Sequence, residues 1–183
     1  MSSSVNKAKQ TAVCGMATAL SVVLMLVAGV VTVMMYVIPV ITGLIVYVIM
    51  QLYGKKWALG VFFATTILSF LLIADKEAAL AYTFFFGYYP LIKEHLEKTP
   101  KAVSIILKFI IFNIAAVAVG VTGVYLFGFS AEEYSEFGKF TIPILLALAN
   151  VMFVMYDIML TRYKALFLGF VKKLAVITGG RKK

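Results

Sequence analysis

The chain has 183 residues, of which 63% are hydrophobic and 14% are charged, and its formal net charge is +9. A soluble domain carries about 25% charged residues, so this chain lacks the polar surface of a water-soluble globule, and lipid is its expected solvent. Its basic residues lie between apolar runs rather than on one face, which argues against nucleic acid and suits an anionic membrane surface. The single cysteine, Cys14, excludes disulfides within the chain and argues against a cysteine metal cluster.

The apolar runs have the length of membrane-crossing helices, which need about 20 residues each. Residues 11–54 contain no charge and suit two crossings, divided between Gly29 and Pro39, where glycine and proline interrupt helices. The first run has no small-residue cleavage site near its end, so we expect a retained helix. The sequence predicts an all-α integral membrane protein, one domain over residues 1–183 with six transmembrane helices at about 11–31, 36–54, 57–73, 78–92, 102–129 and 140–163, and a basic tail at 164–183.

Lysine and arginine indicate the orientation of these helices. With six crossings, one side of the membrane receives 15 of the 17 basic residues, and the other receives only Lys76 and Lys139. Because basic residues concentrate on the cytoplasmic side, we expect a multi-pass protein of the cell membrane with both termini in the cytoplasm.

The stretch FFFGYYPLIKEHLEKTPK, residues 84–101, changes from aromatic to charged near Pro90 and holds the only histidine, His95, between Glu94 and Glu97. An acid–base site would need further polar groups that converge in a pocket, and the sequence offers none nearby. We interpret the charged part as the cytoplasmic turn between helices four and five.

Small residues recur at helical spacing near the start of the first helix, at Ala8, Ala12, Gly15 and Ala19. Such residues let helix backbones approach closely in lipid, where association depends on packing. Two interpretations remain open, packing within the chain and docking with a partner helix.

Polar residues within the bilayer are costly unless they are satisfied. Asn113 and Asn150 are expected at mid-depth of helices five and six, where they can bond each other or a ligand. Asp157 follows Asn150 by one heptad and faces the same way. We expect it to pair with Arg162 or a neighbouring lysine, and a proton relay is the alternative.

An outward-facing ligand pocket is predicted between helices four, five and six. Tyr82, Tyr125 and Asn150 are its expected walls, because the two tyrosines lie near the outer ends of their helices and Asn150 offers both a donor and an acceptor. The acidic loop with Glu132 and Glu133 is its expected cover, or else a plain solvated connection.

Sequence motifs of catalysis are not found in the chain. It has no glycine-rich phosphate loop, no H-E-x-x-H zinc pattern and no G-x-S-x-G elbow. We therefore expect no enzymatic activity, no cofactor and no metal site.

With these features the chain resembles the S component, the substrate-binding membrane subunit, of an energy-coupling factor (ECF) transporter. The likeness extends over nearly the whole chain and is carried by GMATALSVVLMLV (15–27), GKKWAL (54–59) and DKEAALAYTFFFGYYPLIK (75–93). In that family an A-x-x-x-A face of helix one docks on a transmembrane coupling subunit, to which two ATPase subunits attach. The resemblance implies this role for Ala8 and Ala12, with Gly15 and Ala19 near the same spacing, and a vitamin-like micronutrient bound near the outer surface.

Two other functions fit the size and hydropathy of the chain. Small six-helix scaffolds of the bacterial cell-wall elongation machinery bind protein partners rather than a solute. An autonomous small-solute transporter is the third possibility, and it would need an energy source despite few intramembrane charges.

The orientation can be tested by cysteine labelling in intact cells. We predict that Ser135→Cys reacts with an impermeant maleimide from outside, while Thr99→Cys reacts only after lysis, because the basic residues segregate to one side. The parent chain, which has its own Cys14, is the control. The opposite labelling pattern would remove both the orientation and the transport hypothesis.

Overall fold

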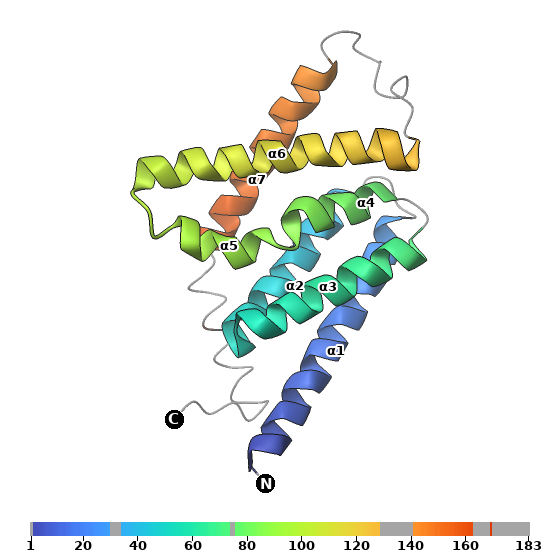
Figure 1. Cartoon of the computed structure of the whole chain (residues 1–183), viewed down its shortest axis with the longest axis vertical. Helices are drawn as coiled ribbons and strands as arrows, with labels where there is room; N and C mark the ends of the chain where they lie inside the picture. Colours follow the sequence, from blue (N-terminus) through green and yellow to red (C-terminus); the bar gives the residue numbers. More distant parts are fainter. Residues whose placement is uncertain (1, 30–33, 74–75, 129–140, 163–168, 170–183) are drawn as a thin grey trace.

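The computed structural model describes residues 2–29, 34–73, 76–128, 141–162 and 169, and these residues are almost entirely helical. The predicted acidic loop, including Glu132, Glu133 and Ser135, lies outside the described residues, as does nearly all of the basic tail. Figure 1 shows the helices, which in chain order are α1 Ser2–Ala28, α2 Val37–Tyr53, α3 Lys55–Leu72, α4 Lys76–Ala81, the π-helix η2 Tyr82–Phe86, α5 Tyr89–Leu96, α6 Lys101–Phe127 and α7 Thr141–Arg162.

The structure has the break between the first two helices within the predicted region. Helix α1 ends at Ala28, and the Gly29 amide still bonds the Met25 carbonyl at 3.2 Å. Pro39 lies in the first turn of α2, where its missing N–H removes no helical hydrogen bond. The start of α1 differs from the prediction by nine residues, because the polar residues before position 11 continue the helix without a glycine or proline to stop it.

A single residue, Gly54, joins α2 to α3. Its φ of 91° lies in the region that L side chains rarely adopt, so glycine is required for this turn. Its amide donates to the Met50 carbonyl at 2.9 Å, and its own carbonyl accepts from the Ala58 amide at 3.2 Å. The two helices therefore form a closely connected pair.

The fourth predicted crossing is not one helix. It divides into α4, η2 and α5, and the Gly87 amide bonds the Tyr82 carbonyl at 2.7 Å in the wider π pattern. Pro90 has no N–H to donate to the carbonyl of Phe86, four residues earlier. That free carbonyl instead accepts the Tyr156 hydroxyl of α7 at 3.1 Å. The break is thus a place where another helix attaches.

The helices pack in layers. Helices α1, α2 and α3 contact one another, the α4–η2–α5 segment lies between them and α6, and α7 crosses α6 steeply (Figure 1). An aromatic cluster fills the space between these layers. Its centre is Phe85, whose ring centroid lies 4.9 Å from that of Phe112 and 5.5 Å from that of Phe153. Phe112 of α6 and Phe153 of α7 stack on each other at 4.7 Å.

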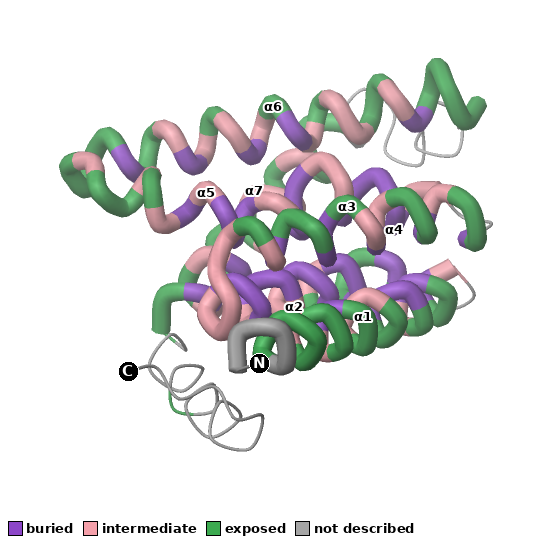
Figure 2. Tube along the Cα trace, turned by 60° about the horizontal axis from the view of Figure 1, so that its bottom comes forward, coloured by how far each residue is buried: buried purple, intermediate pink, exposed green. Residues whose placement is uncertain are grey.

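The outer surface is largely apolar. Four of the described helices are long and apolar enough to cross a membrane, namely α1, α3, α6 and α7, and α2 is apolar but has only 17 residues. In α6 the buried residues Ser104, Lys108, Phe112 and Ala115 recur at intervals of three or four, so one face is buried and the rest of the helix is partly or fully exposed (Figure 2). The all-α prediction is confirmed, and the long apolar helices are compatible with a multi-pass membrane protein.

Close packing at Gly43 of α2 can be tested by adding one methyl group. A Cβ at Gly43 would lie 2.3 Å from the Phe86 carbonyl oxygen and 2.6 Å from the Tyr156 hydroxyl. We predict that Gly43→Ala lowers the free energy of unfolding by about 1–3 kcal/mol, the usual cost of overpacking. Thermal unfolding of the purified protein in detergent measures the loss.

The matched control is Gly60→Ala in α3, where an added Cβ meets nothing within 4 Å. Both substitutions gain the same helix propensity, so their difference isolates the steric conflict. Equal stability of the two variants would contradict the close approach of α2 to η2.

Candidate functional site

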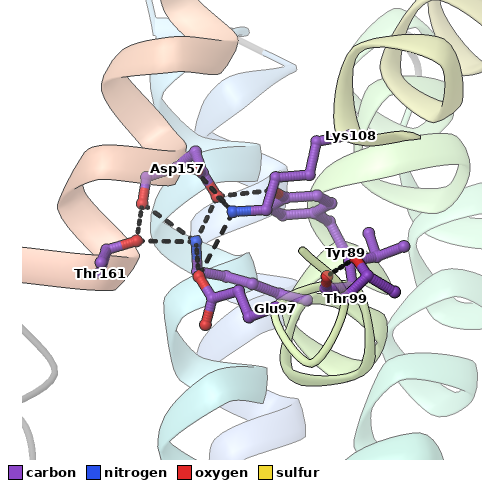
Figure 3. A network of polar contacts seen from close by, with 8 residues as sticks. Tyr89, Glu97, Thr99, Lys108, Asp157 and Thr161 are labelled. Carbon is purple, nitrogen blue, oxygen red and sulfur yellow. Dashed lines mark hydrogen bonds and ion pairs between the residues drawn. The ribbon is translucent and has the colours of Figure 1, made fainter. Parts of the chain in front are cut away.

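Two buried lysines meet one carboxylate where α5, α6 and α7 come together. Lys93 of α5 is 3% exposed and Lys108 of α6 is 8% exposed. The Lys108 ammonium lies 3.1 Å from each carboxylate oxygen of Asp157 on α7, and the Lys93 ammonium bonds Oδ1 of the same carboxylate (Figure 3). Asp157 therefore connects three helices.

A second acid and two hydroxyl groups complete this ion cluster. Glu97 accepts from Lys93 at 2.9 Å and from Lys108 at 3.3 Å. The Tyr89 hydroxyl donates to Asp157 at 2.6 Å, and Lys93 donates to Thr161 Oγ1 at 2.8 Å. The two lysines and two acids balance in charge, which buried ions require.

The ion cluster follows from the spacing of these residues. Lys93 and Glu97 are one helical turn apart, so they share a face. Lys108 lies seven residues after the start of α6, about 10 Å along the helix. Asp157 lies five residues before the end of α7, so both residues are near the same end of the bundle and can meet. The charged ends of three helices thus lie at one end of the bundle.

Burial and neighbouring charge act in opposite directions on these groups. Burial alone would raise the pKa of Glu97, but the Lys93 and Lys108 ammoniums outweigh it and hold that pKa below its ordinary value. The Glu97 contribution to stability is therefore present above the ordinary carboxyl pKa and is lost as the pH falls through the lowered one.

A cleft of about 740 Å³ opens beside the ion cluster, between the first turns of α6 and the last turns of α7. Its floor includes Lys108 and Asp157, and its mouth carries exposed Lys101 and Arg162. Lining residues are Glu97, Thr99, Lys101, Ser104, Ile105, Lys108, Asp157, Ile158, Thr161 and Arg162. This polar cleft is the candidate functional site.

Asn113 and Asn150 bond each other across α6 and α7. Each amide nitrogen donates to the partner's oxygen at 3.1 Å, and each also donates at 2.8 Å to a backbone carbonyl four residues earlier in its own helix. All four amide donors are therefore used within the chain. The groove of about 290 Å³ beside Asn150 is otherwise lined by Phe109, Val151, Val154 and Met155.

The two predicted tyrosines of the outer pocket lie in different surroundings. Tyr82 is 0% exposed, and its ring lies 5.8 Å from that of Phe62 on α3. Tyr125 is 84% exposed near the end of α6. The structure brings Asn113 and Asn150 together but does not bring Tyr82 and Tyr125 together, and the expected cover of the pocket lies outside the described residues.

Small residues on α1 face outward. Ala8, Ala12, Gly15 and Ala19 are all exposed, and a Cβ built on Gly15 meets nothing within 4 Å. The contacts of α1 with α2 and α3 use other faces, such as the one that carries Cys14 and Met25. The sequence left two interpretations of these four residues, packing within the chain and docking with a partner helix. Their exposure does not fit packing within the chain.

The remaining charged turn links α5 to the α2–α3 pair. His95 is exposed and its Nδ1 lies 2.8 Å from the Lys55 ammonium, while Gln51 donates to Glu94 at 3.0 Å. Within the described residues, no three histidine, cysteine or acidic side chains gather as metal ligands would.

The sequence predicts only part of the ion cluster. It predicts a pair between Asp157 and Arg162 or a neighbouring lysine, and in the structure the partners of Asp157 are Lys93 and Lys108. The sequence feature that indicates the cluster is Lys108 itself, a cation within the apolar run VSIILKFIIF of α6.

Comparisons with protein-family models, curated proteins and solved structures find no match to this chain.

The asparagine pair can be tested by a double-mutant cycle. We predict that Asn150→Leu lowers the free energy of unfolding by about 1–2 kcal/mol, because it leaves the Asn113 amide without its partner within apolar surroundings. Asn113→Leu should do the same. The double variant should cost less than the sum of the two, as measured by thermal unfolding in detergent. Strict additivity would mean that the two amides do not interact.

Proposed function

We propose that this chain is the substrate-binding membrane subunit of an ECF-type importer, which docks through α1 on a transmembrane coupling subunit with two ATPase subunits. The observation that carries the proposal is the exposed row of Ala8, Ala12, Gly15 and Ala19 on a helix whose other side contacts α2 and α3. A continuous strip of small side chains allows a second helix to approach closely in lipid. The long apolar helices support the membrane location.

In this proposal all six apolar segments cross the cell membrane, with both termini in the cytoplasm. The divided segment α4–η2–α5 is then a broken crossing whose free Phe86 carbonyl is satisfied by Tyr156, as lipid requires of any irregular backbone. The captured solute is a vitamin-like micronutrient at the outer end of α6 and α7. Tyr125 is open to solvent or lipid there, whereas Asn113 and Asn150 reach a ligand only if their mutual bonds open.

The docking face can be tested by one bulky substitution. We predict that Ala12→Trp leaves the protein folded, since Ala12 is exposed, but weakens its association with the coupling subunit by about 1–3 kcal/mol because the indole ring holds the two helices apart. Copurification of the tagged protein with its membrane partners measures the loss.

Leu20→Trp is the matched control. Leu20 is exposed on the same helix but is turned by about 100° from Ala19, so its ring should leave the partner complement unchanged. An unaltered complement for Ala12→Trp would mean that the row of small residues is not the docking face. Recovery of cell-wall proteins, in place of a coupling subunit and ATPases, would favour the scaffold function.

A further inference from the structure

The polar cleft between α6 and α7 holds an excess of positive charge at its mouth. Lys108 and the neighbouring Lys93 are balanced by Asp157 and Glu97. Lys101 and Arg162 also line the cleft and are exposed, and neither forms an ion pair with any residue that the structure describes. Two cations at one opening favour an anionic ligand.

Two of the three hydroxyl groups that line the cleft bond within the chain, and the third belongs to the buried Ser104. Thr99 donates its proton to the Leu96 carbonyl at 2.6 Å, and Thr161 donates to the Asp157 carbonyl at 2.8 Å. The donors that remain at the mouth are the Lys101 ammonium and the Arg162 guanidinium, whose planar fork matches two oxygens of a phosphate group.

The position of Lys101 adds to this preference. It is the first residue of α6, a helix of 27 residues, so its charge lies at the positive end of the helix dipole. A cation is unfavourable there by itself. An anion bound beside it would interact favourably with both the ammonium and the helix end.

Each wall of the cleft is also amphipathic. Ile105 lies one turn after Lys101 on α6, and Ile158 lies one turn before Arg162 on α7, so each cation has an isoleucine on its own helix face. These isoleucines are 55% and 50% exposed. A ligand that fits both walls has an anionic head and an apolar body.

We propose that this cleft binds an anionic phospholipid, with its phosphate at Lys101 and Arg162 and an acyl chain against Ile105 and Ile158. The inference rests on the membrane location in the proposed function but not on the coupling subunit. The cleft lies at the end of the bundle assigned to the cytoplasm, where the leaflet carries anionic lipid and juxtamembrane cations contact headgroups.

The test is native mass spectrometry of the purified chain released from nanodiscs of equal parts phosphatidylglycerol and phosphatidylcholine. We expect one retained phosphatidylglycerol in clear preference to phosphatidylcholine, and Lys101→Gln/Arg162→Gln should lower that preference by about fivefold for each cation removed. Lys7→Gln/Lys9→Gln is the matched control, because it removes the same charge from exposed positions of α1. The control should retain the lipid as the parent does.

Two further arms locate the lipid and identify the source of the phosphate. Ile158→Glu places a carboxylate on the wall, at a position that is 50% exposed, and should abolish the preference; thermal unfolding in detergent checks that the variant is folded. Soluble glycerol phosphate should not displace the lipid. Equal loss in the control would reduce the effect to general surface charge, and displacement by glycerol phosphate would make this a site for a soluble anion; either result overturns the proposal. The coupling subunit takes no part, so failure here is distinct from failure of the Ala12→Trp test.

Discussion

The carboxylate of Asp157 is the point on which the arrangement of the last three helices depends. Its Oδ1 accepts from Tyr89 and Lys93 of α5 and from Lys108 of α6, while Asp157 itself belongs to α7. Removing one partner of a buried ion pair typically costs about 3–5 kcal/mol, because it leaves a charge that neither water nor protein satisfies. The three helix ends are therefore held in one relative position, and the polar cleft beside Asp157 is a consequence of that position.

Hydropathy predicted the positions of the helices more accurately than their first residues and their internal breaks. Apolar runs identify residues that avoid water, and in each predicted crossing most of the described residues are helical. Hydropathy does not report conformation, so it missed the polar first turns of α1. It also treated the run at 78–92 as continuous, because that run is apolar throughout. The division there comes from the missing N–H of Pro90 and the wider hydrogen bonding before Gly87, which are backbone effects.

In the candidate site, the sequence predicted how far along its helix a residue lies, but it did not predict which way the side chain points around the helix. Depth along α6 and α7 was enough to place Asn113 beside Asn150. It was not enough for the tyrosines, since Tyr82 turns into the core and Tyr125 turns away from it. The polar cleft could not be found from one helix at a time, because Lys101 and Arg162 line it from separate helices that only the fold brings together.

The free carbonyl of Phe86 also constrains how sequences of this kind can diverge. Its existence depends on Pro90, its partner is the hydroxyl of Tyr156, and room for both comes from Gly43. A residue with an N–H in place of Pro90 would offer the carbonyl a second donor, and a phenylalanine at position 156 would leave the carbonyl with none. A substitution at any one of these positions therefore changes which residues are acceptable at the other two. Descendants of this chain should keep or replace the proline, the tyrosine and the glycine as a correlated set, although the three lie on separate helices.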